Sequence, residues 1–160
     1  MRTAAALVFL GLAIASPASA QTAAEGEVLA TIEAFMKGLR EKDAEQMRAL
    51  VEPYTRLTLL RPSPEGGVRV VVLAADEFVE RVSAADQPAI DEPIRNPLVH
   101  IDGDLASVWA EYQVRIDGNV SHCGYDAFHL ARLNGQWKII NVSDTYRREG
   151  CGEAWPGDRP

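Results

Sequence analysis

Three pairs of turn-forming residues divide the stretch from Pro97 to Tyr146, and they constrain the fold more than any other feature. The pairs are Asp102-Gly103, Asp117-Gly118 and Asn134-Gly135. Asp-Gly and Asn-Gly tolerate φ > 0 at both central positions, which a two-residue type I′ hairpin requires. Between the pairs lie runs rich in strand-forming residues: Leu105 to Ile116, Val120 to Leu133 and Trp137 to Ser143. This pattern predicts an antiparallel four-stranded meander whose first strand enters near Ile94.

Two-residue turns would also fix which side chains share a face of this sheet. The hairpin at Asp117-Gly118 sets Tyr112 opposite Cys123. The hairpin at Asn134-Gly135 sets Tyr125 opposite Asp144 and His129 opposite Ile140. Directly opposed residues lie on one face. The predicted inner face carries Tyr112, Tyr125, His129 and Asp144, with Cys123 nearby. The predicted outer face carries Trp109, Glu111, Gln113, Arg115, Asp126, Phe128, Trp137 and Ile139. A single β-bulge would exchange the two faces beyond it.

The residues before the meander predict helices that cover one face of it. Apolar residues recur at helical spacing from Glu27 to Arg40 and from Asp76 to Ala84. Asp43, followed by Gln46, predicts the start of a further helix that stops before Pro53. Two strands are predicted at Tyr54 to Leu60 and Val68 to Leu73. Helices, strands, a helix and then a meander are typical of the α+β class, with a curved, mostly antiparallel sheet around about three helices.

The N-terminus predicts export. Met1-Arg2 is followed by a largely apolar stretch, Ala4 to Ala15, that is too short to span a bilayer, and then by Ala18-Ser19-Ala20. These are the parts of a secretory signal peptide. We therefore expect a signal peptide at 1–20, one domain at 21–146 and a polar tail at 147–160. The expected location is the periplasm or the exterior of the cell, with no membrane attachment after cleavage.

The net charge of the chain limits which classes of partner are expected. The chain has a net charge of −7 and no run of basic residues, so nucleic acid is not an expected partner. No phosphate-binding loop, metalloprotease motif or nucleophile motif occurs. The three histidines, His100, His122 and His129, do not share one predicted face, so we expect no metal. No cofactor is predicted.

The two cysteines, Cys123 and Cys151, lie in a chain predicted to reach an oxidising compartment. In the predicted register Tyr146 faces Cys123, and Gly150 would let the tail turn back toward it. A Cys123–Cys151 disulfide is expected on these grounds. Two free thiols are the alternative.

The element order and the stretch His122 to Thr145 resemble the nuclear transport factor 2-like superfamily, which includes ketosteroid isomerase-like and SnoaL-like proteins. The branch most similar is the small exported proteins named "putative lumazine-binding". Specific likenesses are Asp102 to Ala106, Gly135 to Ile139 and the two cysteines. The resemblance implies a cone-shaped sheet, a pocket at its open end and frequent dimers through the outer face. The segment Tyr54 to Thr58 lacks the carboxylate that a steroid isomerase would carry there, so that activity is not expected.

Three functions remain open on this scaffold, because one fold hosts many activities. The first is an exported binder of a small apolar or heteroaromatic ligand, with no catalysis. Its candidate ligand-binding residues are Phe35, Met47, Tyr112, Tyr125, His129 and Asp144. The second is an isomerase or dehydratase with Asp144 as base and Tyr112 or Tyr125 as donor, His129 lying nearby. The third is a homodimeric interaction module that uses Trp109, Phe128 and Trp137 on the outer face. For Phe35, Met47 and His129 the alternative interpretation is ordinary core packing. For Asp144 it is a structural hydrogen bond to a tyrosine hydroxyl or a cap of the strand end. For the outer face it is coverage by the C-terminal tail, including Trp155.

Overall fold

The computed structural model of the chain describes residues 17–155. Its elements are α1 (Pro17–Glu41), α2 (Ala44–Leu50), β1 (Val51–Pro62), β2 (Val68–Ala74), α3 (Ala75–Ser83), β3 (Ile90–Asp91), β4 (Ile94–Asp102), β5 (Leu105–Ile116), β6 (Asn119–Leu133) and β7 (Gln136–Asp144). Most of the predicted signal peptide (1–20) lies outside the described residues, as does the end of the predicted tail. No helix in the described part is both long enough and apolar enough to cross a bilayer.

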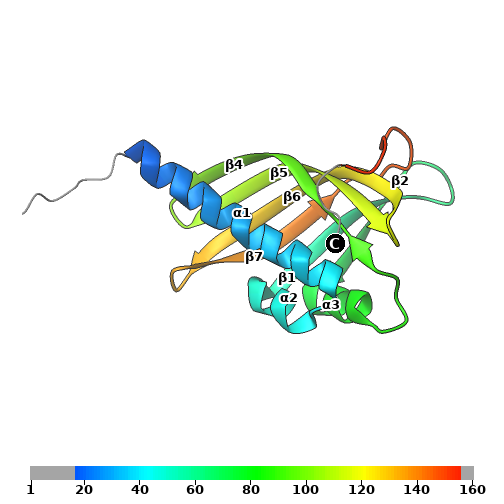
Figure 1. The fold of residues 1–160 in the computed structure, drawn as a ribbon, viewed down its shortest axis with the longest axis horizontal. Helices are drawn as coiled ribbons and strands as arrows, with labels where there is room; N and C mark the ends of the chain where they lie inside the picture. Colours follow the sequence, from blue (N-terminus) through cyan, green and yellow to red (C-terminus); the bar gives the residue numbers. More distant parts are fainter. Residues whose placement is uncertain (1–16, 156–160) are drawn as a thin grey trace, which may run out of the picture.

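One seven-stranded sheet organises the molecule. Its strand order is β2-β1-β7-β6-β5-β3, and β4 also pairs with β5. Strands β4 to β7 form the predicted antiparallel meander. The exception to antiparallel pairing is β1, which runs parallel to β7. Helix α1 crosses one face of the curved sheet, and α2 and α3 lie near one end of α1 (Figure 1). The predicted α+β fold, a curved sheet around three helices, is confirmed.

The hairpin turns follow the sequence prediction with one shift. Asp117 and Gly118 have φ of 50° and 80°, and Asn134 and Gly135 have φ of 51° and 78°, as a type I′ turn requires. The first turn differs, because Asp102 still pairs with Leu105. Its two central residues are therefore Gly103 and Asp104, and the predicted Asp102-Gly103 turn is one residue too early.

Two β-bulges correct the predicted register. In the β5–β6 hairpin, Arg115 faces Val120 but Val114 faces His122, so Ser121 is the extra residue. In the β6–β7 hairpin, Leu130 faces Ile139 but His129 faces Asn141, so Ile140 is the extra residue. Beyond the bulge at Ser121, the side chains of β6 lie on the faces opposite to those predicted. Beyond the bulge at Ile140, the side chains of β7 return to their predicted faces.

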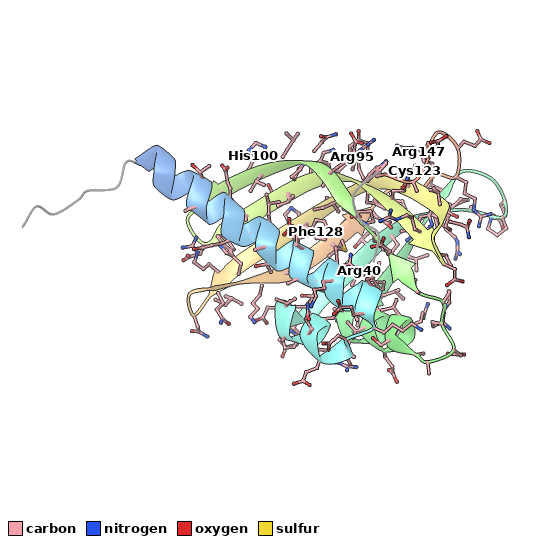
Figure 2. All side chains as sticks on the ribbon, in the orientation of Figure 1. Arg40, Arg95, His100, Cys123, Phe128 and Arg147 are labelled. Atoms are coloured by element: carbon pink, nitrogen blue, oxygen red, sulfur yellow. A yellow bond between two sulfur atoms is a disulfide. The ribbon has the colours of Figure 1, made fainter. Side chains whose placement is uncertain are left out.

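The bulges change which residues lie inside. Phe128, Trp137 and Ile139 were expected on the outer face but are buried in the core. Figure 2 shows Phe128 between α1 and the sheet. Helix α1 contributes its predicted apolar stripe to this core: Val28, Ile32, Phe35 and Leu39. The predicted partner surface therefore retains only Trp109, which is 45% exposed.

Helix α2 begins as predicted. The Asp43 side chain accepts a hydrogen bond of 2.9 Å from the backbone N–H of Gln46, which satisfies one free donor at the helix start. Gln46 does not complete a capping box, because its side-chain amide donates to the carbonyl of Ala34 in α1 instead. That contact joins α2 to α1.

The tail after β7 lies on the outer face of the sheet. Cys151 forms the predicted disulfide with Cys123, and their Cα atoms are 5.5 Å apart. The buried side chain of Gln113 donates to the carbonyls of Cys151 and Glu153, and accepts from the N–H of Trp155. The Arg95 guanidinium lies 3.9 Å from the centre of the Trp155 ring. These contacts hold the tail across β4, β5 and β6.

Candidate functional site

A cavity of about 180 Å³ lies between the helices and the inner face of the sheet. Most of its wall is apolar and comes from α1, α3 and five strands. Phe35 stacks near Phe78, with ring centres 6.5 Å apart. The apolar lining residues are Phe35, Met36, Leu39, Leu57, Leu59, Phe78, Val82, Ile90, Val114, Ile116, Phe128 and Val142. Such a wall excludes water and favours an apolar ligand body.

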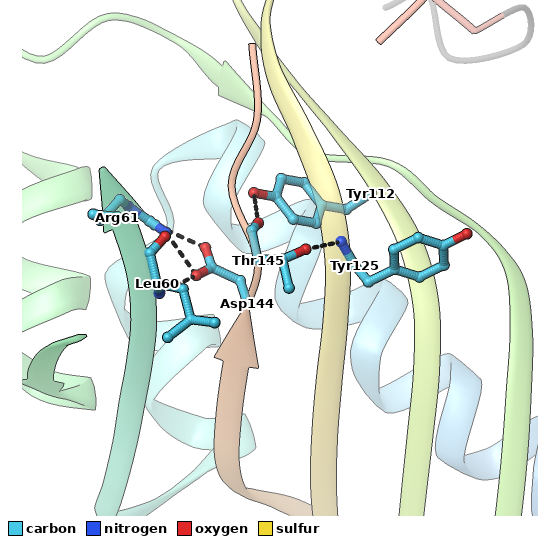
Figure 3. A network of polar contacts seen from close by, with 6 residues as sticks. All are labelled: Leu60, Arg61, Tyr112, Tyr125, Asp144 and Thr145. Atoms are coloured by element: carbon cyan, nitrogen blue, oxygen red, sulfur yellow. Dashed lines mark hydrogen bonds and ion pairs between the residues drawn. The ribbon is translucent and has the colours of Figure 1, made fainter. Parts of the chain in front are cut away.

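Five polar residues complete the wall of the cavity: Arg61, Glu92, His122, Asp126 and Asp144. The strongest contact among them joins β1 to β7. The Arg61 guanidinium donates two hydrogen bonds, of 2.6 and 2.7 Å, to the two carboxylate oxygens of Asp144 (Figure 3). Asp144 also accepts from the N–H of Leu60 at 3.2 Å. This bidentate, partly buried pair fixes both side chains at the cavity wall.

Asp126 has a different environment from Asp144, although the two residues face each other across the β6–β7 ladder. Its side chain is 1% exposed, and its Oδ2 atom has no hydrogen-bond partner in the part of the chain described. Burial raises the pKa of the Asp126 carboxyl well above its ordinary value. The charges of Glu92 and Asp144 raise it further, while Arg61 opposes them. The site thus favours a neutral Asp126, which can both donate and accept a hydrogen bond.

Glu92 follows the short strand β3 and adds a third carboxyl to this wall. Burial, followed by the charge of Asp144, raises its pKa to about 8. This value is the net result, in which the charge of Arg61 opposes the rise in pKa and the charge of Asp91 adds to it. At neutral pH the cavity therefore presents two carboxyl groups that favour the protonated form, Glu92 and Asp126, beside the Arg61–Asp144 ion pair.

His122 also lines the cavity, and its ring contacts Tyr112, which does not. Burial and, to a smaller extent, the charges of Arg61 and Arg148 together lower the pKa of His122 to about 4, so its ring is neutral at pH 7. The edge of the His122 ring meets Tyr112, with ring centres 5.9 Å apart. The Tyr112 hydroxyl donates a 2.6 Å hydrogen bond to the carbonyl of Thr145. That hydroxyl is therefore directed at the backbone after β7, as Figure 3 shows.

Gly124 makes this arrangement of Tyr112 possible. A Cβ atom at position 124 would lie 2.2 Å from the carbonyl oxygen of Thr145 and 2.7 Å from Cε1 of Tyr112. Glycine is thus required in the middle of β6 by the close approach of the ring and the neighbouring backbone.

The predicted site residues separate into three groups. Phe35 and Asp144 line the cavity. Met47 and Tyr112 are buried in the protein interior but do not line the cavity. Tyr125 and His129 lie on the outer face because of the Ser121 bulge, so the expectation that they face Asp144 is wrong. Tyr125 stacks on Trp109 there, with ring centres 5.1 Å apart. Its backbone meets Thr145 twice: the N–H of Tyr125 donates to the Thr145 hydroxyl, and the carbonyl of Tyr125 accepts from the Thr145 N–H.

Sequence reasoning missed Arg61, Glu92 and Asp126. Asp126 was assigned to the outer face by the unbulged register, and Glu92 and Arg61 lie in segments without a site motif. The usable signal was the spacing of Asp126, Phe128 and Leu130 along β6, because residues two apart in a strand share a face. No group of three potential metal ligands is positioned to hold an ion within residues 17–155.

Comparison with known proteins identifies relatives of this chain. The family described as "Putative lumazine-binding" matches residues 23–146. A cystatin-like protein of unknown function from Nostoc punctiforme is 17% identical, with a TM-score of 0.61 over 78% of this chain and 92% of that one. A protein from Streptomyces avermitilis described as a putative dehydratase of the NTF2-like family is 16% identical, with a TM-score of 0.62 over 78% and 96%.

A third solved structure, the association domain of CaMKII from C. elegans, is 17% identical, with a TM-score of 0.61 over 79% of this chain and 98% of that one. At these identities the likeness shows the fold. No protein of curated function matches the chain. The family match covers most of the chain and agrees with the cystatin-like, NTF2-like fold, so the chain belongs to the "putative lumazine-binding" family.

Proposed function

We propose that this protein binds a small molecule whose apolar or heteroaromatic body fills the cavity. The observation that carries this proposal is the carboxyl of Asp126 at the wall of an otherwise largely apolar cavity, with a buried oxygen that has no partner among the described residues. A buried polar atom without a hydrogen bond costs about 1–3 kcal/mol. A ligand that donates a hydrogen bond to Asp126 would recover that cost.

The polar part of the cavity wall also limits the class of ligand. It combines the Arg61–Asp144 ion pair with two carboxyls, Glu92 and Asp126, that favour the neutral form. The part of the ligand inside the cavity is therefore uncharged and carries both donors and acceptors. A heteroaromatic ring with amide-like edges has these properties, and the name of the family supports testing lumazine first.

Binding is tested by thermal denaturation with lumazine and with 1-naphthol as probes. A ligand that binds only the folded state adds RT ln(1 + [L]/Kd) to the free energy of unfolding. We expect Val142→Phe, which fills the cavity, to abolish the shift, while Val70→Phe on the exposed side of β2 leaves it unchanged. Equal shifts in the two variants, or none with either probe, would contradict the proposal.

Acid–base catalysis is the second candidate function, and Asp126 is the residue that favours it. A carboxyl with a raised pKa in an apolar cavity can exchange a proton with a bound substrate at neutral pH. Asp126 is preferred to the pair first considered, Asp144 with a tyrosine, because Asp144 binds Arg61 and the Tyr112 hydroxyl donates to the carbonyl of Thr145. An isomerase or dehydratase would lose turnover but keep ligand binding in Asp126→Asn. A variant that loses neither removes Asp126 from this role.

We also propose that the protein is exported. The support is the signal-like sequence at 1–20 and the disulfide, since disulfides persist in oxidising compartments. Expression of the full chain in a bacterial host, followed by N-terminal sequencing of the periplasmic fraction, should give a start at Gln21. An intact N-terminus in the cytoplasmic fraction would contradict export.

A further inference from the structure

A second cleft, of about 620 Å³, shares Arg61 with the cavity. Four of its lining residues are arginines: Arg61, Arg69, Arg147 and Arg148. The aromatic ring among them is Tyr146, and the acidic residue is Glu149. Such a concentration of guanidinium groups is unusual for a chain whose net charge is −7.

The fold itself brings these arginines together. Arg61 and Arg69 are paired across the β1–β2 ladder. Strand β7 runs parallel to β1, with Asp144 beside Leu59, so the residues that follow β7 emerge next to the end of β1. Backbone hydrogen bonds between Arg147 and Cys123 then hold the tail at that place. The cluster is thus built by the β1–β2 hairpin and by the tail, two segments that are distant in the sequence.

The charges of the cluster are poorly compensated by the protein. Elsewhere arginines meet carboxylates, as in the Arg48–Asp76, Arg81–Glu77 and Arg95–Glu111 pairs. Within residues 17–155, by contrast, no ion pair joins Arg69, Arg147 or Arg148 to an acidic side chain. Like charges held in one cleft repel one another, so an anion bound among them would be stabilised.

Aromatic contacts orient two of these guanidinium groups. The Nε atom of Arg148 donates a 2.7 Å hydrogen bond to the Tyr146 hydroxyl. Arg61 lies 5.2 Å from the centre of the same ring, and that ring lies 4.6 Å from the ring of His122, which lines the cavity. Arg61, Tyr146 and His122 therefore lie side by side where the cleft adjoins the cavity.

We propose that the arginine cleft binds the anionic group, a phosphate or a carboxylate, of the same small molecule whose uncharged body fills the cavity. This inference rests on the proposed binding function and specifies its ligand as an amphipathic anion. Guanidinium groups bind such oxyanions through paired N–H donors, which suits a cluster of arginines better than a single charge would. The shared residue, Arg61, lets one ligand contact both sites.

A matched pair of probes tests this assignment: 1-naphthol and 1-naphthyl phosphate, with binding measured by calorimetry on the full chain. We expect the phosphate ester to bind about tenfold more tightly, which corresponds to one charge-assisted hydrogen bond. That advantage should disappear in Arg69→Ala/Arg148→Ala. It should persist in Arg48→Ala/Arg81→Ala, a control with the same loss of charge on exposed helix residues. It should also decrease as salt is raised.

The outcomes separate the two proposals. If both probes bind equally, the arginine assignment is wrong and the cavity proposal stands. If the advantage persists in Arg69→Ala/Arg148→Ala, the cleft is not the anion site. Tight binding of inorganic phosphate alone, with no difference between the probes, would overturn a shared ligand, as would binding only to vesicles of phosphatidylglycerol. If neither probe binds, both proposals fail.

Discussion

Asp126 and Asp144 face each other across the β6–β7 ladder, yet only Asp144 has a cationic partner. Arg61 holds both oxygens of Asp144, while the Oδ2 atom of Asp126 is buried without a partner in the described chain. Burial raises the pKa of the Asp126 carboxyl, while Asp144 is held in an ion pair, so the two adjacent carboxyls suit separate roles. Asp144 positions Arg61, and Asp126 is the carboxyl that we propose contacts a ligand.

Glu92 should make stability depend on pH. Its pKa of about 8 lies above the ordinary value of 4.5, so the folded state keeps a proton that the unfolded state has lost. The free energy of unfolding should therefore fall as pH rises from 4.5 to about 8, and then level off. Urea unfolding at several pH values should show a smaller fall in Glu92→Gln. Glu65→Gln, in the exposed β1–β2 loop, should behave like the wild type; if Glu92→Gln does so too, the assignment is wrong.

Removing the carboxylate of Asp144 should destabilise the protein. Asp144→Asn would leave the partly buried Arg61 without its counter-ion, at a cost of about 2–3 kcal/mol after allowance for the exposure of Arg61. Glu77→Gln breaks the exposed Arg81–Glu77 pair and should cost less than about 1 kcal/mol. Urea denaturation compares the two variants, and equal losses would show that the Arg61 pair is not structurally important.

The Gly124 position provides a steric test of the site. Gly124→Ala should displace Tyr112 or the backbone at Thr145, and overpacking of this kind costs about 1–3 kcal/mol or more. Gly26→Ala is the matched control, because no atom lies within 4 Å of its added Cβ in helix α1. That change should stabilise the protein by about 0.5–1 kcal/mol. A stable Gly124→Ala variant would contradict the close approach.

The sequence predicted the order of the elements because the turn pairs, the helical apolar stripe of α1 and the Asp43 cap are local signals. It could not place the bulges at Ser121 and Ile140, which arise from packing across strands and have no residue signature. Since one extra residue exchanges the faces of a strand, Tyr125 and His129 were assigned inward and Asp126 outward. Asp144 was placed correctly because the second bulge reverses the first.

Substitution of Trp109 tests whether the outer face of the sheet is a contact surface between two copies of the chain. We expect a homodimer through this face, because Trp109 remains 45% exposed while stacked on Tyr125 and lies near the exposed Leu98 and Leu105. Trp109→Glu should convert the dimer to a monomer in sedimentation. Phe128→Glu should instead unfold the protein, since Phe128 is buried in the core. A mass unchanged by Trp109→Glu would remove this face from consideration.

The disulfide should contribute to stability by restricting the unfolded chain. Cys123 and Cys151 are 28 residues apart, a separation for which the chain-entropy estimate is about 3–4 kcal/mol. Cys151→Ser should therefore lower the melting temperature by several degrees.

The three hydrogen bonds between Gln113 and the tail should keep part of the tail in place, so Gln113→Ala combined with Cys151→Ser should release it. Limited proteolysis after Arg147 and Arg148 reports that release. Rapid cleavage in the wild type would show that the tail is not held, and alkylation of both thiols in native protein would show that the bond is absent.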